Sequence, residues 1–455
     1  MVMVKPNIVF IVLDTLREDY AEYFKNNLVN KYGFIFYKNS ISCSPWTTPA
    51  HASIFTGNYP LIHGVHESRN RKITDVKLES TSILNVYLKS KGYITYLLSA
   101  NPLISPHFGF TGFKYLYLHD YSLPLPLLNN HDLDELREIK LELSSGGKKE
   151  LLKALLKERK YKLLFKDAAN HFLIKLYHPI YMRMNNWPKD KGVRKILLKL
   201  KKFLEKRYEK RFIFLNFMEM HEPYSRKLIF KKYFFENILF NKEIDERVIS
   251  IFKMKYRDQA KYLSSKIIEL LNLLMEYNEF DRSLIIITSD HGQLLGEYKR
   301  IGHGIFLYDE LLKIPLLIKY PENISIRLSE NEFKYISLVN FKKFIVALVN
   351  GRINSDDILY SDIVFSESYG VHIPYGRSVS DKINDLEKYR IAVYYDNLKM
   401  IFNVSDWCIE SIYPEDYKRS DIVFLKKKVI DFLKSAIRRK LIKKLKYRRL
   451  GHNIV

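Results

Sequence analysis

The sequence predicts an α/β fold: a three-layer α/β/α sandwich with a mostly parallel central sheet, joined by a helical insertion and a smaller C-terminal antiparallel subdomain. Continuous apolar runs such as residues 8–13 and 284–288 are rich in β-branched side chains, which is typical of strands buried on both faces. Helical segments alternate with these runs through most of the chain. From about residue 362 short alternating strands replace that pattern, which indicates the antiparallel subdomain.

Polar residues follow the apolar strands at their carboxyl ends. The strand 8–13 runs into Asp14, 93–99 leads to Asn101, 212–217 is followed by His221, and 284–288 by Asp290 and His291. Because ligands of α/β sheets bind beyond the carboxyl ends of the strands, we expect Asp14, Asp290 and His291 to lie close together around one ion. Carboxylate oxygens and imidazole nitrogens are ligands suited to Zn, Mn or Mg. No second Asp/His set of comparable spacing stands out in the sequence.

A hydroxyl stands at the predicted start of the helix 47–56. Thr47 precedes Pro49, which a first helical turn tolerates, and the helix is expected to stop at Gly57. The unpaired N–H groups and positive dipole end of such a turn favour an anion such as a phosphate or sulfate ester. An ordinary threonine N-cap is the alternative explanation of these residues.

Breaks in the α/β alternation divide the chain. Ser144 to Gly147 has the composition of a linker, and basic helices follow it. The predicted parts are a catalytic domain in two pieces, 1–139 and 211–361, a basic helical insertion at 140–210, an antiparallel subdomain at 362–424 and a basic amphipathic tail at 425–455.

The net charge of +24 is concentrated in two segments. Residues 148–210 carry 20 Lys and Arg against 6 Asp and Glu, and residues 425–455 carry 12 against 1. In the tail, apolar residues recur near helical spacing, which favours an interfacial helix in contact with anionic lipid. Packing of this apolar face on the domain is the alternative. The charge of these segments is also compatible with nucleic-acid binding, but the sequence shows no recognition motif for nucleic acids.

Composition favours a cytoplasmic location, at most peripheral to the inner face of a membrane. The two cysteines, Cys43 and Cys408, cannot build a disulfide framework. The opening residues run straight into an apolar strand without the pattern of a signal peptide. No window of 18 uncharged apolar residues predicts a spanning helix. Nothing in the sequence indicates an oligomeric state.

Several motifs together resemble the sulfatase family within the alkaline phosphatase superfamily. They follow the family's order along the chain: Ile11-Val-Leu-Asp14, Thr47-Thr-Pro-Ala-His-Ala-Ser-Ile-Phe-Thr-Gly57, Asn101 with Phe108-Gly-Phe-Thr-Gly-Phe113, His221-Glu-Pro-Tyr224, Thr288-Ser-Asp-His-Gly-Gln293 and Gly302-His-Gly304. The resemblance implies the sandwich fold and one divalent ion, Mn, Zn, Mg or Ca, held by Asp14, Thr47, Asp290 and His291. It also implies a phosphate- or sulfate-ester substrate, including glycan- or lipid-linked esters.

One departure from the family pattern concerns the nucleophile. Family sulfatases carry Cys or Ser ten residues before the Gly of the Thr-Gly pair and oxidise it to formylglycine, whereas counting back from Gly57 reaches Thr47. Threonine cannot yield formylglycine, because its methyl group would leave a ketone. Cys43 would need four additional residues before Thr56 and is the rival candidate. His51 stands where the sulfatase Arg would be, a second departure.

Family members with a threonine nucleophile resemble phosphodiesterases, phosphomonoesterases and phosphoglycerol transferases, so phosphorus is favoured over sulfur. We expect Thr47 to attack the ester and form a covalent intermediate. His221 and His303 are the candidates for binding the ester oxygens and protonating the leaving group. His51 and Asn101 are the candidates for substrate binding. A sulfuric ester hydrolase and a non-catalytic binding protein with a retired site are the alternatives.

Overall fold

The computed structural model describes residues 5–79, 83–119, 148–206, 210–226, 230–329, 333–374 and 383–449, with residue 331 and short pieces between 127 and 139. The chain divides into two compact units, one of residues 1–120 and 192–455 and one of residues 121–191. The smaller unit therefore differs from the predicted insertion at 140–210. The predicted linker at Ser144 to Gly147 lies outside the described residues.

Helix α8 (Val193–Leu204) explains the difference at the C-terminal end of the insertion. Its apolar face, which includes Ile196 and Leu200, is fully buried, and the helix packs beside strand β4 and helix α10 of the larger unit. The lysines that made this segment look separate lie on the opposite, outer face. The charged residues of α8 therefore lie on one face only, and its other, apolar face is part of the main core.

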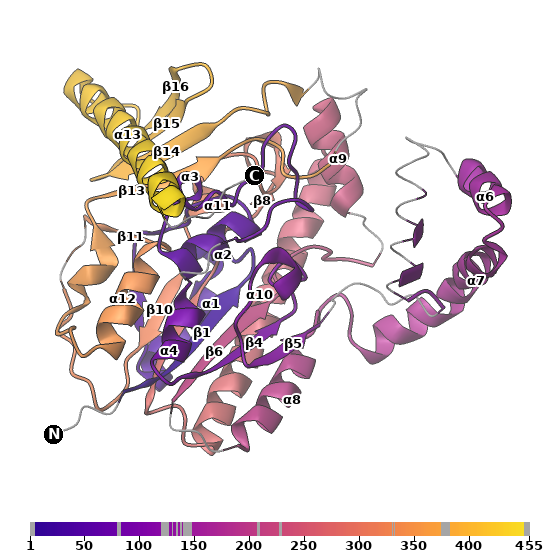
Figure 1. Ribbon diagram of the computed structural model, residues 1–455, viewed down its shortest axis with the longest axis horizontal. Helices are drawn as coiled ribbons and strands as arrows, with labels where there is room; N and C mark the ends of the chain where they lie inside the picture. Colours follow the sequence, from indigo (N-terminus) through magenta and orange to yellow (C-terminus); the bar gives the residue numbers. More distant parts are fainter. Residues whose placement is uncertain are drawn as a thin grey trace. The chain divides into compact units, whose positions relative to one another are not determined.

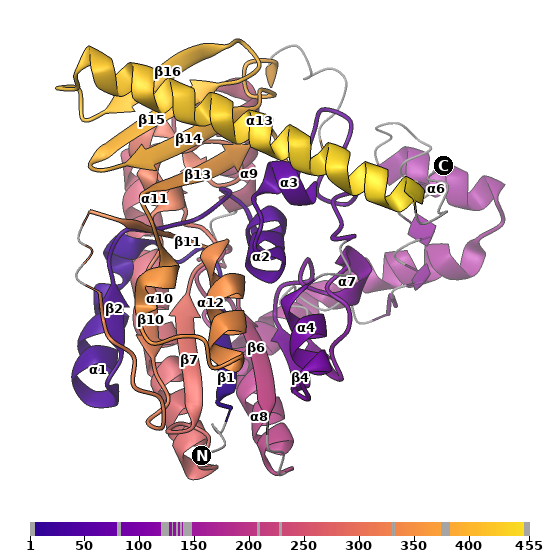
Figure 2. The ribbon, with the colours of Figure 1, turned by 60° about the vertical axis from the view of Figure 1, so that its left-hand side comes forward.

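The core of the larger unit is a seven-stranded sheet in the order β2-β10-β7-β1-β6-β4-β5 (Figures 1 and 2). Its strands are β1 (Asn7–Leu13), β2 (Ile35–Tyr37), β4 (Ile94–Ser99), β5 (Tyr115–Leu118), β6 (Arg211–Phe217), β7 (Ser283–Thr288) and β10 (Leu316–Lys319). Strand β10 is antiparallel to both neighbours, and the pairs from β7 to β5 are parallel. The predicted mostly parallel sheet is confirmed.

Helices cover both faces of this sheet. Ile8, Phe10 and Val12 of β1 share one apolar core with residues of α2 (Thr47–Thr56), α4 (Leu84–Ser90) and α12 (Asn340–Val349). Helix α10 (Glu246–Glu276) lies on the other side and contacts both α1 (Glu22–Tyr32) and α8 (Figures 1 and 2). Because β1, β6 and β7 are buried on both faces, their central residues are mostly apolar and do not alternate with polar ones, although β6 contains Asn216.

The C-terminal part contains the predicted antiparallel sheet, in the order β13-β14-β15-β16. Its strands are β13 (Ile363–Ser368), β14 (Arg390–Tyr395), β15 (Leu398–Asn403) and β16 (Cys408–Tyr413). Helix α13 (Arg419–Arg449) lies across this sheet (Figure 2) and buries Leu425, Val429 and Phe432 against it.

This packing accounts for much of the apolar face for which the sequence left both lipid contact and packing on the domain open. The predicted boundary between residues 424 and 425 falls inside α13, and the buried residues of the helix continue to Ala436. Ile437 is 56% exposed, and the side chains of Leu441 and Leu445 lie outside the described ones. Packing on the domain, the alternative given above, therefore explains the first half of this face.

The remaining elements are short or belong to the smaller unit. The larger unit also holds β3 (Ser40–Ile41), β8 (Leu294–Leu295), β9 (Ile301–Gly302), β11 (Tyr335–Ser337), β12 (Tyr360–Ser361), α3 (Pro60–His63), α9 (Phe230–Phe240) and α11 (Asp309–Leu312), with 3-10 turns at Glu18–Tyr20, Pro106–Phe108, Glu297–Lys299 and Asp356–Leu359. In the smaller unit, α6 (Lys148–Lys157) and α7 (Tyr161–Met184) enclose a small leucine-rich core. Among the helices of the described residues, none has the length and apolarity needed to cross a membrane.

Candidate active site

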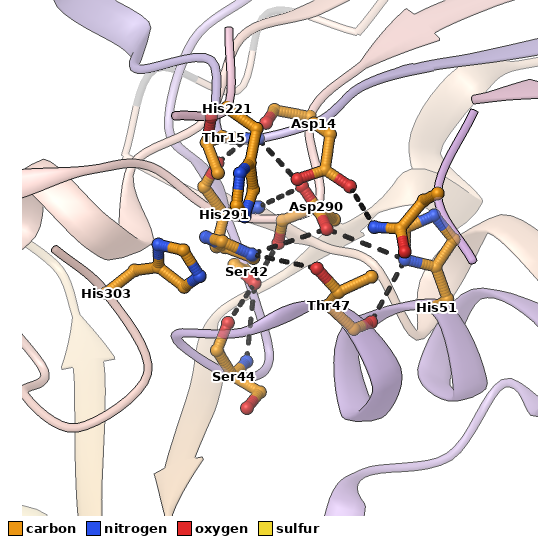
Figure 3. A network of polar contacts seen from close by, with 12 residues as sticks. Asp14, Thr15, Ser42, Ser44, Thr47, His51, His221, Asp290, His291 and His303 are labelled. Atoms are coloured by element: carbon orange, nitrogen blue, oxygen red, sulfur yellow. Dashed lines mark hydrogen bonds and ion pairs between the residues drawn. The ribbon is translucent and has the colours of Figure 1, made fainter. Parts of the chain in front are cut away.

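The predicted ligand residues converge at the carboxyl ends of neighbouring strands. Strands β6, β1 and β7 are adjacent and parallel, and Asp14 directly follows β1 while Asp290 and His291 follow β7. All three side chains are fully buried, and one ligand atom from each lies within 4.8 Å of the other two (Figure 3). The alignment of parallel strand ends therefore brings together residues that are 276 positions apart.

Thr47 completes this group from the first turn of α2. The helix begins there because Trp46 has an extended backbone (φ −153°), and it ends at Gly57, whose positive φ of 67° suits glycine. The side chain of Thr47 is buried, and its hydroxyl donates a hydrogen bond to Nε2 of His291 at 3.3 Å. The hydroxyl thus faces the carboxylates at the positive end of a helix.

The unpaired atoms of the two carboxylates fit a divalent cation. Oδ1 of Asp14 and Oδ2 of Asp290 are buried and have no hydrogen-bond partner among the described residues. Burial raises the pKa of both carboxyls to about 6, and the charge of Asp290 adds to the effect on Asp14. A cation would remove this electrostatic cost, so the residues present fit the metal that the resemblance implies.

The hydrogen bonds of His291 prepare it as a ligand. Its Nδ1 donates to the carbonyl oxygen of Gly292 at 2.9 Å, which leaves the lone pair on Nε2, the atom that faces Thr47. Burial lowers the pKa of His291 to about 4, so the imidazole is neutral at neutral pH. A neutral, oriented imidazole is the form that binds a metal ion.

Asn101 lies against the carboxylate of Asp14. Its amide nitrogen donates to Oδ2 of Asp14 at 2.7 Å, and its amide oxygen accepts from the backbone N–H of Leu103 at 2.9 Å. The residue was predicted to bind substrate. Both ends of its side chain are instead engaged within the protein, in contacts that orient a candidate metal ligand.

His51, the other predicted substrate residue, lies behind the threonine. It is fully buried one helical turn after Thr47, and its Nδ1 donates to the carbonyl oxygen of Thr47 at 3.0 Å. Its Nε2 accepts from the side-chain amide of Asn216 at 3.1 Å, and burial lowers its pKa to about 3. A neutral imidazole with both nitrogens occupied supports the first turn of α2.

His221 and His303 form the more open side of the site. Both are partly exposed, and their ring centroids lie 5.1 Å apart. The ring of His303 is also 4.7 Å from that of His291. Figure 3 shows His303 and His51 on opposite sides of Thr47. An ester approaching Thr47 from the side of His303 would therefore meet these two imidazoles.

The structure adds residues that the sequence analysis did not single out. Glu222 and Gln293 directly border His221 and the Asp-His-Gly turn, so adjacency to a predicted residue was the signal available for them. Asn216 lies within the otherwise apolar strand β6, and a single amide in such a strand does not by itself indicate a functional site. His372 stacks on Trp46 at 5.2 Å and lies 5.8 Å from His303, a position that no local pattern indicates.

A family model for "Sulfatase" matches residues 6–351. The chain belongs to the sulfatase family. The fold agrees: a phosphonate monoester hydrolase from Agrobacterium radiobacter shares 14% identity and superposes with a TM-score of 0.61, covering 96% of each chain. A 2-O GAG sulfatase shares 12% identity with a TM-score of 0.60, covering 96% of this chain and 93% of the other. The resemblance to the sulfatase family is confirmed.

Similarity in sequence to curated relatives is confined to a short stretch. The N-acetylglucosamine-6-O-sulfatase of Bacteroides thetaiotaomicron is 42% identical over 55 residues, which are 12% of this chain and 10% of that protein. Such matches span only 8% to 17% of the lengths of the curated relatives. They therefore support the family and leave the substrate of this member to be argued from its own residues.

Within this sulfatase fold, Cys43 lies apart from the ligand group. Its side chain is fully buried in the apolar core that includes Trp46 and Ile336, and its sulfur lies 3.5 Å from the hydroxyl of Ser337. Burial raises the pKa of the thiol to about 11, which disfavours the reactive thiolate. Thr47 lies beside the ligand group and Cys43 lies in the core. These positions agree with the ten-residue spacing, which points to Thr47 as the candidate nucleophile.

Proposed function

We propose that this sulfatase-family protein is a metal-dependent hydrolase or transferase that acts on phosphate esters through a covalent intermediate on Thr47. One observation carries the proposal: the Thr47 hydroxyl contacts His291 beside two carboxylates, while Cys43 is enclosed in the core. A threonine at this position cannot become formylglycine. The fully buried, unpaired carboxylate oxygens support the metal requirement.

The roles of the residues follow from their contacts. Asp14, Thr47, Asp290 and His291 would hold Mn, Zn, Mg or Ca, which supplies a Lewis acid that lowers the pKa of the hydroxyl and offsets ester charge. Asn101 orients Asp14, and His51 with Asn216 supports the turn that carries Thr47. All three act as positioning residues.

In the reaction, Thr47 Oγ1 would lose its proton to solvent water and form a bond to phosphorus while the bond to the leaving-group oxygen breaks. His221 and His303 are placed on the open side, where a side chain can contact the ester oxygens and deliver a proton to the leaving group. Water or an acceptor alcohol then cleaves the phosphothreonine. The choice between water and alcohol separates hydrolysis from transfer.

Turnover of two chromogenic esters tests the proposal. Bis-p-nitrophenyl phosphate should be cleaved faster than p-nitrophenyl sulfate, and a chelator or Thr47→Ala should abolish the cleavage. Thr74→Ala, at an exposed loop threonine, is the matched control and should behave as the wild type. Faster cleavage of the sulfate would support a sulfuric ester hydrolase instead. Absence of cleavage of either ester would support a non-catalytic binding protein whose site has lost its activity.

Sugar-linked esters are the favoured substrate class. Two similar proteins are named as an N-acetylglucosamine-6-O-sulfatase and a 2-O GAG sulfatase, and both names describe esters on glycans. A panel of sugar phosphates, with p-nitrophenyl phosphate for comparison, tests this choice. A lower KM for the sugar esters is the expected result.

We propose that the protein contacts the cytoplasmic face of a membrane through the basic C-terminal end of α13. The high charge of residues 425–455 supports contact with anionic lipid. Because truncation would remove buried residues of α13, the variant to use is Arg438→Glu with Arg439→Glu, at exposed positions. Equal flotation of this variant and the wild type with anionic liposomes would exclude the contact.

A further inference from the structure

We propose that helix α7 of the smaller unit lies in the interface of an anionic lipid bilayer and inserts its exposed apolar side among the acyl chains. Five large apolar side chains of this helix are between 60% and 76% exposed: Phe165, Phe172, Leu176, Ile180 and Met184. These five residues form the α7 face. Single exposed apolar residues are common on proteins, but several together on one helix mark an interaction site.

The α7 face lies along one side of its helix. Its residues follow one another at intervals of seven, four, four and four positions, which places them within an arc of about 120° around the helix axis. Leu163 and Leu164 lie on the other side, where they pack with Leu151 and Leu155 of α6 in the leucine-rich core of the smaller unit. The unit therefore packs around one side of α7 and leaves the α7 face exposed.

The apolar part of α7 has the length of an interfacial segment. Residues 172–184 contain no acidic residue and only three basic ones, Lys175, His178 and Arg183. Crossing a bilayer takes about 20 apolar residues, whereas a stretch of roughly 10 to 14 is typical of a buried core helix or an interfacial segment. No helix in the described part of the chain meets the requirement for crossing. Because the α7 face is exposed, burial in a protein core does not explain the stretch, and an interfacial position does.

Charge favours anionic lipid as the partner of this face. Residues 148–184, which form α6 and α7 with the turn between them, carry 10 Lys and Arg against 3 Asp and Glu. Lys160 and Lys166 form ion pairs inside the unit, but Lys162, Lys175 and Arg183 are exposed on α7. Basic side chains beside an exposed apolar face are typical of helices that lie on anionic membranes. A second copy of the chain has the same positive charge here and would be repelled.

Two of these cations stand near the ends of the helix. Lys162 and Arg183 fall within the same arc as the α7 face, so their apolar stems can lie in the interface while their charged ends reach the lipid phosphates. The 24 residues of α7 span about 36 Å, which suits a helix lying along the membrane surface. This contact depends neither on the end of α13 nor on the proposed phosphate-ester function.

Flotation with vesicles tests the contact in the full-length protein. The vesicles contain equal parts of phosphatidylglycerol and phosphatidylcholine, and phosphatidylcholine alone is the uncharged comparison. The wild type should float with the anionic vesicles. Phe172→Glu with Ile180→Glu should lower the partition coefficient at least about tenfold, because two apolar groups leave the bilayer and two anions approach it. Met254→Glu with Met275→Glu, at exposed positions of α10, is the matched control and should bind as the wild type does.

The same comparison in the Arg438→Glu, Arg439→Glu background separates the α7 face from the end of α13. In that background the protein should still float with anionic vesicles. A concentration of about 1 M NaCl, at which the Debye length is about 3 Å, should weaken this binding without abolishing it, since apolar insertion is not screened. Equal flotation with and without the two substitutions on α7 would overturn the inference.

A fluorescent label on α7 gives a second measurement, which does not need the glutamate variants to fold. Cys43 is buried and Cys408 is exposed, so Leu176→Cys with Cys408→Ser offers one accessible thiol for a nitrobenzoxadiazole label. Anionic vesicles should shift its emission to the blue, and nitroxide groups on the acyl chains should quench it. An emission that vesicles leave unchanged would overturn the inference. Light scattering then names the occupant: a dimer indicates a second copy, and a monomer with blue emission indicates another part of the same chain.

Discussion

The side-chain amide of Asn101 lies 2.7 Å from Oδ2 of Asp14 and joins the ends of two strands, β4 and β1, that are not neighbours in the sheet. Asn216 of the intervening strand β6 directs its amide toward the same oxygen at 3.5 Å. Two amides therefore hold one carboxylate oxygen, and the other oxygen of Asp14 is left without a hydrogen-bond partner among the described residues. That unpaired oxygen is the one we expect to bind the metal.

Asn101→Ala should weaken metal binding without removing a ligand. Loss of an outer hydrogen bond to a metal ligand typically lowers affinity by roughly 10- to 100-fold. Titration calorimetry of the metal-free protein with Mn²⁺ measures this change, and Asn26→Ala, at an exposed position of α1, is the control. An unchanged affinity in Asn101→Ala would mean that the amide does not orient Asp14.

The buried carboxyl of Asp14 should make the metal-free protein sensitive to pH. Its pKa rises from 3.8 to about 6 on folding, so the folded state holds more protons than the unfolded state between these values. The contribution of Asp14 to the free energy of unfolding therefore falls as the pH rises through this window. At pH 7.5 the ionised carboxyl is a net cost, which a bound cation would remove.

The variant Asp14→Asn tests the predicted direction of this pH dependence. In the metal-free protein it should raise Tm at pH 7.5 and change it less at pH 5, where the carboxyl is mostly protonated. With Mn²⁺ the order should reverse, since only the wild type gains stability from the ion. Asp258→Asn, on the surface of α10, should change Tm little in either condition. A lower Tm for metal-free Asp14→Asn at pH 7.5 would contradict the assignment.

Phe432 should anchor α13 to the rest of the protein. Its ring stacks on Phe365 at 4.4 Å and meets Tyr59 edge-on at 5.4 Å, and it is 8% exposed. Phe432→Ala should lower the free energy of unfolding by about 3 to 5 kcal/mol, as for other buried phenylalanines. Ile437→Ala, five residues along the same helix and 56% exposed, is the matched control and should have a small effect. Urea denaturation measures both, and equal values would place α13 off the sheet.

The sequence predicted the fold well where burial on both faces dominates. The strands around Ile11, Leu215 and Ile286 are uniformly apolar, and parallel pairing forces their carboxyl ends to one edge, so convergence of Asp14 with Asp290 could be anticipated. Prediction was poorest for segments with one charged face. Lysines on α8 and α13 suggested an insertion and a separate amphipathic tail whose apolar face either contacts lipid or packs on the domain, because a sequence does not show which partner covers the apolar face of an amphipathic helix.

The candidate site shows a similar limit. Asp14, Thr47, Asp290 and His291 were predicted because each stands at a strand end or a helix start. Glu222 and Gln293 were not predicted as site residues. Gln293 hydrogen-bonds to His303 and to Glu222, and these contacts form only when the β8–β9 hairpin folds back. Asn101 and His51 were placed in the right region, but their hydrogen-bond partners within the protein could not be read from spacing.

The identity of the nucleophile is the prediction on which the assignment turns. If Thr47 attacks phosphorus, Thr47→Ala should reduce cleavage of bis-p-nitrophenyl phosphate by roughly a thousandfold or more, since loss of a nucleophile removes the covalent route. Metal binding should largely survive, because Asp14, Asp290 and His291 remain. Thr47→Ser should keep part of the activity, as the hydroxyl is retained and only the methyl that restricts its rotamer is lost.

Cys43→Ser is the companion variant, because Cys43 is the rival nucleophile. The thiol is fully buried beside Ser337, so an oxygen in its place should leave kcat nearly unchanged. A formylglycine sulfatase would give the reverse pattern: the mass of the Cys43 peptide would show the oxidised residue, aryl sulfate would be the better substrate, and Cys43→Ala would be inactive while Thr47→Ala remained active. Mass measurement of the peptide that contains both residues, together with the two rates, decides between them, because a single chain cannot satisfy both patterns.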